Sequence, residues 1–254
     1  MLSKEKIIEE LKNLGITPPK IIFYESIDST NTRAKEWAKQ NPDNHSPVVF
    51  IANRQTAGRG RRGRSFVSEG GAGIYISILT YPKESGADAT ATTARAAVTL
   101  AKATESLSDC DIKIKWVNDL YLGDKKLAGI LTEGEMGEDG KIAYQVVGMG
   151  INVYKNAISN EISDIATSLE GELGIGIDRS KLAAVIIKYH LNYKGDFYTE
   201  YKSRSFIIGR RVTVVKLNES YKAKVLDIDK DYALIIDRDG KTERLFTGEI
   251  SLKI

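Results

Sequence analysis

The segment AGRGRRGRS, residues 57–65, contains residue types that bind phosphate groups. Its glycines at positions 58, 60 and 63 have the spacing of a dinucleotide-binding fingerprint, and the segment also approximates a phosphate-binding loop with arginine in place of lysine. Both motifs require a helix directly after the glycines, with its N-terminus facing the phosphate. Here more glycines follow, at positions 70, 71 and 73, and then the strand-like run GIYISILTY. The sequence therefore predicts neither motif.

The arginines of this segment nevertheless indicate an anionic ligand. Four of them lie within six positions, namely Arg59, Arg61, Arg62 and Arg64. Like charges at this spacing repel one another unless an anion screens them. Guanidinium groups bind phosphate through two parallel hydrogen bonds, and glycines let the backbone fold around a small molecule. We expect a loop that becomes ordered when a phosphorylated ligand binds; a basic loop in solvent is the simpler alternative.

Two further segments place polar residues at the ends of apolar strands. In KIKWVNDLYLGDKKLAGILTE, residues 113–133, they are Lys115, Asn118, Asp119 and Lys126. In GMGIN, residues 148–152, glycines allow close approach to the backbone and Asn152 is the polar tip. Taken alone, the first segment also fits a hairpin with ordinary edge charges, so its interpretation depends on the other motifs.

The composition excludes several classes of protein. The 254 residues are 42% hydrophobic and 28% charged, with a formal net charge of +3, which by itself is too small to indicate nucleic-acid binding. Cys110 is the only cysteine, which excludes an internal disulfide and favours a reducing compartment. No apolar run approaches the roughly 20 residues of a membrane span, and the N-terminus reads as an amphipathic helix rather than a signal peptide. We expect a cytoplasmic protein with no membrane partner.

Metal-based chemistry has little support in the sequence. The two histidines, His45 and His190, are far apart and have no cysteine pairs beside them, which argues against zinc. The segment that begins at Asp227 starts like a calcium loop but has Tyr232 where glycine is needed. We assign no metal ligand, and we expect His190 to be a packed residue of a helix. The chemistry must then depend on lysine, arginine, aspartate and bound ligands.

The apolar pattern predicts a large domain followed by a small one. Strands are expected at 21–25, 48–54, 73–81, 112–116, 125–133 and 142–151, with a hairpin turn at 138–140. Helices are expected at the N-terminus and at 29–39, 87–107 and 179–201. After residue 208 the chain has short alternating segments separated by turn residues, which is typical of a small all-β barrel. The predicted domains are 1–206 and 207–254.

Five short segments of the chain, in their order along the sequence, resemble motifs of the biotin protein ligase family. They are DSTN at 28–31, Gln55 with GRGRRGR at 58–64, KWVND at 115–119, KLAGIL at 126–131 and GMGIN at 148–152. Val117 and Phe66 depart from the family, which usually has proline and often tryptophan there. The resemblance implies an α+β fold, with a mixed β-sheet flanked by helices as in class II aminoacyl-tRNA synthetases, and a small C-terminal SH3-like β-barrel.

The resemblance also implies a two-step reaction. Biotin and ATP give biotinyl-5′-AMP and pyrophosphate, and the biotinyl group then passes to a lysine of a biotin carboxyl carrier domain in a carboxylase. Mg²⁺ would neutralise the polyphosphate of ATP. The arginine-rich loop would be a lid that keeps the reactive anhydride from water.

Roles for individual residues follow from the resemblance alone. The implied catalytic residues are Arg61, Arg64, Asp119 and Lys126, with Asp119 orienting or deprotonating the acceptor lysine. The implied biotin-binding residues are Ser29, Thr30, Asn31, Gln55, Gly58, Arg59, Arg61, Lys126, Gly129, Leu131 and Gly148. The implied residues for ATP and the adenylate are Arg61, Arg62, Arg64, Phe66, Lys115, Asn118 and Asn152.

The sequence and the resemblance also predict binding partners and leave two alternative functions. About 20 residues precede the first strand, too few for a helix-turn-helix module, so we expect a ligase that does not bind DNA. Related enzymes often dimerise through the catalytic sheet, so a homodimer is expected. A lipoate or octanoate ligase is the nearest alternative. A nucleic-acid-binding protein is a further alternative, but the acidic stretch 227–231 in the predicted barrel disfavours it.

Overall fold

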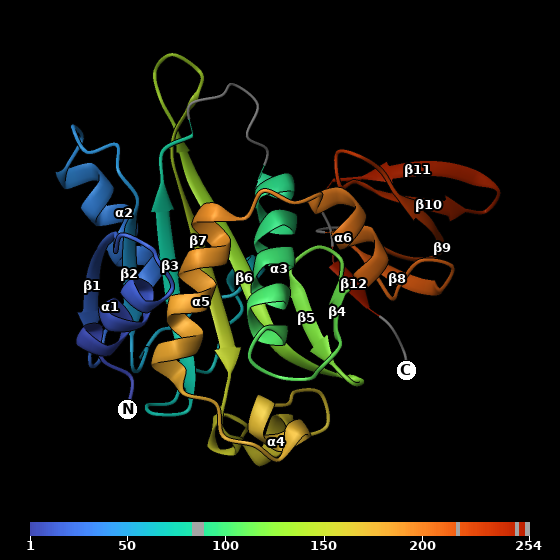
Figure 1. Cartoon of the computed structure of the whole chain (residues 1–254). Coiled ribbons are helices and arrows are strands. Elements are labelled where there is room, and N and C mark those ends of the chain that lie inside the picture. Colours follow the sequence, from blue (N-terminus) through green and yellow to red (C-terminus); the bar gives the residue numbers. More distant parts are fainter. Residues whose placement is uncertain (83–88, 217–218, 247–248, 252–254) are drawn as a thin grey trace.

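The chain folds into a large mixed sheet with helices on both faces and a smaller antiparallel sheet at the C-terminal end (Figure 1). The structure is a computed structural model, and it describes residues 1–82, 89–216, 219–246 and 249–251. Among these residues no helix is both long enough and apolar enough to cross a membrane. The α+β architecture predicted from the sequence is confirmed.

The larger sheet has seven strands in the order β1-β2-β3-β7-β6-β5-β4. The pair β1 and β2 is parallel and the other neighbours are antiparallel. The strands are β1 (Lys20–Tyr24), β2 (Val48–Ala52), β3 (Gly73–Thr80), β4 (Ile112–Lys115), β5 (Asp119–Leu122), β6 (Lys125–Met136) and β7 (Ile142–Asn152). The centre of the sheet therefore joins segments that are far apart in the sequence.

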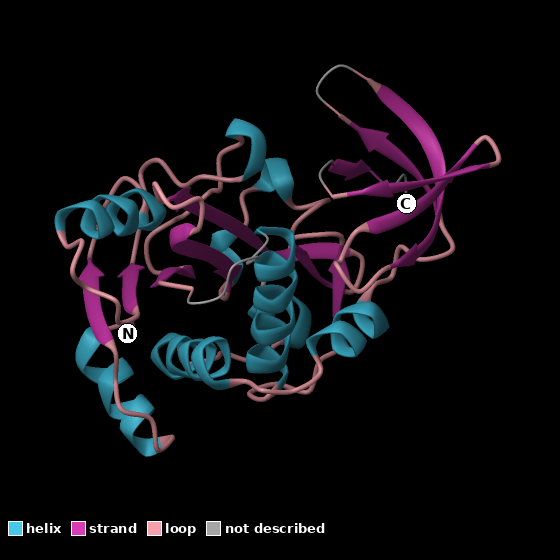
Figure 2. Cartoon of the chain, turned by 90° about the horizontal axis from the view of Figure 1, so that it is seen from above, coloured by secondary structure: helices cyan, strands magenta, loops and turns pink. Residues whose placement is uncertain are grey.

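Helices cover this sheet on both sides (Figure 2). They are α1 (Lys4–Asn13), α2 (Thr30–Gln40), α3 (Ala89–Glu105), α4 (Leu169–Leu173), α5 (Arg179–Asn192) and α6 (Phe197–Arg204), with 3₁₀ turns at Arg61–Gly63, Lys155–Ala157 and Asn160–Ile162. Helix α3 packs beside α5, and α2 packs against β2, β3 and β7. Many buried positions of α3 are alanine or threonine, which lets the neighbouring elements approach closely.

Strand β2 explains why two separate cores form. All five of its residues are buried, and successive side chains of a strand point to opposite faces. Val49 and Ile51 belong to the large core, whereas Val48 and Phe50 belong to a smaller cluster under α2. The strand is therefore buried on both faces, and its second face holds α2 against the sheet.

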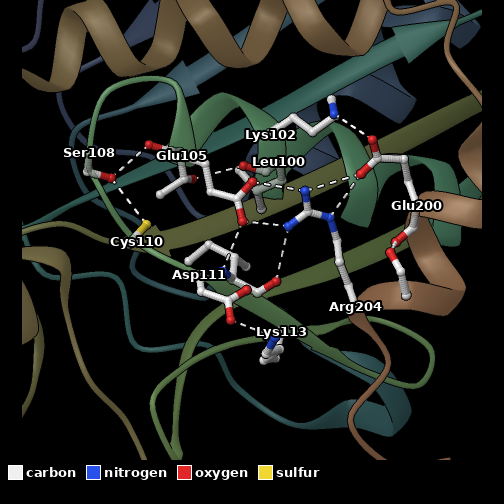
Figure 3. A network of polar contacts seen from close by, with 12 residues as sticks. Leu100, Lys102, Glu105, Ser108, Cys110, Asp111, Lys113, Glu200 and Arg204 are labelled. Carbon is white, nitrogen blue, oxygen red and sulfur yellow. Dashed lines mark hydrogen bonds and ion pairs between the residues drawn. The ribbon is translucent and has the colours of Figure 1, made fainter.

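Charged side chains fasten α6 to the end of α3 (Figure 3). Arg204 of α6 lies 2.5 Å from Glu105 of α3 and 3.2 Å from Glu200 one turn earlier. Arg204 Nη1 also donates to the carbonyl of Ile112 at 3.2 Å. Lys102 pairs with Glu200 at 2.7 Å. This network therefore fixes α6, the last helix before the C-terminal sheet, to the larger part of the molecule.

The C-terminal sheet has five antiparallel strands in the order β11-β10-β9-β8-β12. They are β8 (Arg211–Val215), β9 (Ser220–Ile228), β10 (Leu234–Arg238), β11 (Lys241–Leu245) and β12 (Glu249–Ser251). Alternate residues of β8 are buried, as the sequence pattern predicts, and in β9 the alternation holds for Ala223 and Val225 before the register shifts. The sheet is joined to the larger part by Trp116, whose indole N–H donates to the carbonyl of Tyr232 at 2.8 Å.

Several predicted boundaries differ from the structure. The helix predicted at 179–201 is divided into α5 and α6, because Gly195 and Asp196 interrupt it and the Asp196 carboxylate caps the second helix by accepting from the Thr199 N–H. Strand β2 ends at Ala52 rather than at 54, and β5 was not predicted as a separate strand. Residues 87 and 88 of the predicted helix 87–107 lie outside the described residues.

Candidate functional site

The arginine-rich loop connects β2 to β3 and folds back on itself. The Phe66 N–H donates to the Gly58 carbonyl at 2.9 Å, and the Gly60 N–H donates to the Arg64 carbonyl at 2.7 Å. At its tip Arg62 has φ 54 and Gly63 has φ 76, both in the left-handed region that glycine tolerates best. Strand β3 follows, and no α-helix does, which agrees with the rejection of both phosphate-binding motifs.

A cavity of about 880 Å³, including its open mouth, lies between this loop and the large sheet. The N-terminal end of α2 and the strands β6 and β7 supply its other walls. The predicted residues that line it are Ser29, Thr30, Asn31, Gln55, Arg59, Arg61, Arg62, Arg64, Phe66, Asn118, Asp119, Lys126, Gly129, Leu131 and Gly148. Residues separated by more than a hundred positions thus meet in one place.

Two glycines of β7 make room for side chains at the cavity floor. A Cβ atom on Gly148 would collide with the side-chain amide of Asn31, and one on Gly150 would lie 2.5 Å from the ring of Phe66. Real Cβ atoms do not approach other atoms so closely, so only glycine fits at these positions without displacing its neighbour. Both glycines therefore shape the cavity rather than serve a turn.

One end of the cavity is a network of neutral polar groups. Gln55 Oε1 accepts from the Thr30 N–H at 2.8 Å and lies 3.0 Å from the Thr30 hydroxyl. The hydroxyl of Ser77, buried on β3, lies 2.7 Å from Thr30 Oγ1 and 2.6 Å from Asn31 Oδ1. Gln55 Nε2 donates to Ser68 Oγ at 3.0 Å. Such a network suits a small polar ring that has both donors and acceptors.

A carboxylate lies behind this network. Glu133 on β6 accepts from Asn31 Nδ2 at 2.9 Å and pairs with Lys35 at 2.7 Å and with Arg59 at 3.2 Å. Burial opposes ionisation of Glu133, but the hydrogen bonds from Lys35 and Asn31 and the charge of Arg59 outweigh it and lower the pKa of its carboxyl group. The carboxylate is therefore ionised near neutral pH.

The other end of the cavity is charged. Lys126 Nζ lies 2.6 Å from Asp119 Oδ1, and neither side chain is fully exposed. Arg61 Nη1 donates to Asn118 Oδ1 at 3.1 Å, and Asn118 Nδ2 donates to the Ile130 carbonyl at 3.0 Å. The backbone around Lys126 is held by hydrogen bonds to residues 165 and 167. Cations on fixed supports of this kind can stabilise negative charge as it develops during a reaction.

Three predicted site residues lie outside the cavity lining. Gly58 supports the loop from behind, where a Cβ atom would collide with the Phe66 carbonyl. Lys115 Nζ lies 5.8 Å from the ring centre of Tyr121. The Asn152 side chain is buried and donates to the Thr167 carbonyl at 3.1 Å. In this structure, therefore, Asn152 fastens β7 to the segment before α4 and does not face the cavity.

Some lining and supporting residues were not predicted. They are Gly60, Ser65, Tyr75, Ile76, Ile130, Met149 and Gly150 in the lining, with Ser68, Ser77 and Glu133 behind it. Ser77 had a visible signal, because it is the one serine within the apolar run GIYISIL. Glu133 had a weaker one, since it ends an apolar strand pattern and resembles an ordinary surface charge.

Among the described residues that line the cavity, Asp119 carries the only carboxylate. Within the described ranges, no group of three or more His, Cys, Asp or Glu side chains is arranged to hold a metal ion. His190 lies on α5, and burial lowers its pKa to about 4. It does not line the cavity.

The sequence and structure were compared with those of known proteins. Residues 23–152 match the model of the biotin/lipoate A/B protein ligase family, and residues 207–253 match the biotin protein ligase C-terminal domain. The bifunctional ligase/repressor BirA of Bacillus subtilis is 31% identical over 242 residues, which cover 91% of this chain and 74% of that protein. The biotin–[acetyl-CoA-carboxylase] ligase of Mycobacterium tuberculosis is 30% identical, with 80% of this chain and 78% of that protein covered.

A solved structure agrees with these matches. The biotin protein ligase of Aquifex aeolicus in complex with biotin and ATP has a TM-score of 0.73 and 29% identity, and the alignment covers 91% of this chain and 97% of that one. Residues 23–152 are 130 of the 254 residues, slightly more than half. The motifs, the cavity beneath the arginine-rich loop and these matches agree, and the chain belongs to the biotin/lipoate A/B protein ligase family.

Proposed function

We propose that this protein is an ATP-dependent biotin protein ligase, which activates biotin as biotinyl-5′-AMP and transfers it to a lysine of a biotin carboxyl carrier domain. The observation that carries the proposal is the cavity itself. It joins a polar network around Thr30 and Gln55 to a charged end at Lys126, and the arginine-rich loop covers it. Biotin has the same sequence of features: a polar ring, an apolar chain and a carboxylate.

The ring of biotin would lie in the polar network. Ser29, Thr30, Asn31 and Gln55 offer hydroxyl and amide groups, and Arg59 adds a guanidinium. The apolar chain would pass over Gly129, Leu131 and Gly148, which line the cavity and present no polar side chain. Gly58 would act indirectly by shaping the loop.

In the first step, an oxygen of the biotin carboxylate attacks the α-phosphorus of ATP, and the bond to the departing pyrophosphate breaks. Two anions must approach each other, so the barrier depends on cations aimed at the reacting oxygens. Lys126 is assigned to the carboxylate and the α-phosphate, and Arg61 and Arg64 to the phosphate oxygens. Arg62, Phe66, Lys115, Asn118 and Asn152 are proposed nucleotide contacts; Lys115 and Asn152 would have to turn toward the cavity.

In the second step, the amine of the acceptor lysine attacks the acyl carbon of the anhydride, AMP leaves and the amine gives up a proton. The amine must be neutral to attack. Asp119 lies 2.6 Å from Lys126, at the end of the cavity where the anhydride would form. We assign to Asp119 the role of orienting the amine or accepting its proton.

Mg²⁺ is proposed to accompany ATP. The described residues offer no cluster of carboxylates for a resident ion, so the ion would be held largely by the phosphate oxygens. Its chemistry would be to neutralise polyphosphate charge. The cations of the loop act on the same oxygens.

Further proposals concern the whole protein. We propose a catalytic domain at 1–206 and an SH3-like domain at 207–254, which the match of residues 207–253 supports. The cytoplasm is the proposed location, a biotin carboxyl carrier domain is the proposed protein partner, and a homodimer is the proposed assembly.

The test is pyrophosphate release with Mg-ATP and either biotin, lipoate, octanoate or no acid, combined with mass spectrometry of the retained product. Release that requires biotin, with bound biotinyl-5′-AMP, is expected. Release with lipoate or octanoate but not with biotin would mean that the protein is a lipoate or octanoate ligase, the nearest alternative. If no pyrophosphate were released with any of the three acids, the proposed function would be contradicted.

A further inference from the structure

Glu133 connects three parts of the polar end of the cavity without lining the cavity itself. It lies on β6, its Oε2 atom accepts from Asn31 at the start of α2, and its Oε1 atom contacts Lys35 of α2 and Arg59 of the loop. Its side chain is only 18% exposed. Glu133 has no catalytic role in the proposed reaction.

An ionised carboxylate fixes the orientation of the Asn31 amide. A carboxylate can only accept hydrogen bonds, so Asn31 must turn its NH₂ group toward Glu133. The second N–H of this group donates to the Leu131 carbonyl at 3.2 Å. The oxygen of the amide must then face Ser77, which lies 2.6 Å away. The charge on Glu133 therefore decides which end of the Asn31 amide reaches the network.

The orientation of the Asn31 amide determines how the hydroxyl groups of Ser77 and Thr30 are oriented. Ser77 has one hydroxyl hydrogen, and it is used toward Asn31 Oδ1. Ser77 therefore has none left to donate to the Thr30 hydroxyl at 2.7 Å. Thr30 must donate to Ser77 or to Gln55 Oε1, which lies 3.0 Å away. In either case the hydroxyl of Thr30 presents only its lone pairs to the cavity, where they can accept from an N–H group.

We propose that Glu133 is a positioning residue that sets the direction of the hydrogen bonds through Asn31, Ser77 and Thr30, and thereby prepares the pocket for the cyclic urea of biotin. The inference rests on the proposed function. A cyclic urea carries two N–H donors and one carbonyl acceptor, so it distinguishes between a hydroxyl that accepts and one that donates. A ligand without N–H groups would gain nothing from this arrangement.

The same strand offers a matched control. Glu135 lies two positions further along β6 and also pairs with a lysine of α2, Lys39, at 3.0 Å. Its carboxylate also accepts from the Tyr144 hydroxyl at 2.7 Å. It contacts none of the residues of the polar network. Glu133→Gln and Glu135→Gln therefore each remove one negative charge, but only Glu133 contacts a residue of the polar network.

The experiment measures the Kd of biotin, the apparent KM of ATP and the thermal midpoint for the parent and both variants. For Glu133→Gln we expect the Kd of biotin to rise about tenfold or more, with the KM of ATP changed by less than about twofold. Glu135→Gln should match the parent in both constants. Because the loss of Glu133 also leaves Lys35 without its carboxylate, the double variant Lys35→Met with Glu133→Gln is included. It should recover thermal stability but not biotin affinity.

The remaining outcomes show whether the role of Glu133 or the proposed function itself is wrong. If Glu133→Gln bound biotin as tightly as the parent, or if the double variant recovered biotin affinity together with stability, Glu133 would be a plain structural ion pair and the inference would be overturned. The double variant also gives this answer if the single variant does not fold. A parent that binds no biotin would instead overturn the proposed function, and with it the ligand assigned to the network.

Discussion

At the scale of single residues, the cavity separates neutral hydrogen-bonding groups from charged ones. Thr30, Gln55 and Ser77 lie at one end, and Lys126 with Asp119 lies at the other. This separation suits a ligand whose reacting group is remote from its recognised group, since binding energy from one end can then hold the other end in a reactive position. The two ends should therefore respond differently to substitution.

Lys126→Ala should lower the rate of adenylate formation by roughly a hundredfold to a thousandfold, because it removes a fixed cation from the reacting oxygens. Biotin should still bind, since the polar network is intact. Single-turnover pyrophosphate release measures the effect. Lys125→Ala is the control, because this neighbouring lysine donates to the Ser163 carbonyl at the surface and does not line the cavity. Equal losses in both variants would contradict the assignment.

Arg61→Gly should leave biotin binding largely intact while the adenylate escapes roughly tenfold to a hundredfold faster, as expected when a charged hydrogen-bonding group is lost. The released adenylate should then label lysines of other proteins indiscriminately. Adenylate retention after rapid gel filtration gives the rate, and labelling of a bystander protein gives the consequence. Arg61→Lys, which keeps the charge but loses the forked geometry, should lie between the two. If the Arg61→Gly variant retained the adenylate as tightly as the parent, the assignment of Arg61 to the lid would be wrong.

At the scale of secondary-structure elements, β7 and α2 shape the pocket together. The floor of the pocket depends on close approach between the β7 backbone and the Asn31 side chain. Helix α2 is fixed by the small core that it shares with β2, so it has little freedom to withdraw. A single methyl group on β7 should therefore disturb the ligand end of α2.

Gly148→Ala should raise the KM of biotin about tenfold or more, since the added methyl displaces Asn31, and should change the KM of ATP far less. Steady-state kinetics with each substrate varied in turn would show the difference. Gly176→Ala is a suitable control, because no atom lies within 4 Å of the position that its Cβ would take. An unchanged KM of biotin would mean that Asn31 does not contact the ligand.

Helix α5 contains a group that makes stability depend on pH. Burial lowers the pKa of His190 from 6.5 to about 4, and its Nδ1 atom has no hydrogen-bond partner within the described part of the chain. Between these pH values the unfolded chain binds the proton and the folded protein does not, so the free energy of unfolding should fall as the pH is lowered from about 6.5 to about 4. His190→Gln should flatten this slope in denaturant titrations. His45→Gln, at an exposed position, is the control substitution.

At the scale of the whole molecule, the two sheets meet close to the site. Trp116 reaches the Tyr232 carbonyl from the turn between β4 and β5, and Arg62 at the tip of the loop donates to the Val215 carbonyl at 2.9 Å. The C-terminal sheet thus contacts both the turn that precedes Asn118 and the loop that covers the cavity. A change at this junction should affect stability and loop closure together.

Trp116→Phe should lower the free energy of unfolding by roughly 1–3 kcal/mol, because it leaves the Tyr232 carbonyl without its donor at a buried position. Equilibrium unfolding in urea measures the change. Trp37 of α2 is half-buried and packs beside Phe50, so Trp37→Phe is the same substitution without a hydrogen bond between the two sheets, and it should cost less. Equal costs would mean that the junction adds nothing to stability.

Much of this organisation was predictable because it depends on local chemistry. Apolar runs predicted most strands of the larger sheet, alternating apolar residues predicted those of the C-terminal sheet, and the glycines after the arginine-rich loop excluded a helix there. The family motifs then predicted most of the cavity lining, from Ser29 to Gly148. The division of helix 179–201 was missed because apolar periodicity continues across Gly195, whereas the cap made by Asp196 acts over only three residues.

The remaining features depend on contacts between distant residues, which no local pattern contains. Glu133 has the appearance of a surface charge until β6 and α2 bring it against Asn31 and Lys35. Asn152 has the appearance of a site residue until the Thr167 carbonyl accepts its N–H. Residue type and spacing predict the strands, the loop and the motifs, and the resemblance carried by those motifs then implies the fold class and the chemistry. Which side chains face the cavity follows from packing, because a polar group that is buried must find its partner wherever the folded chain supplies one.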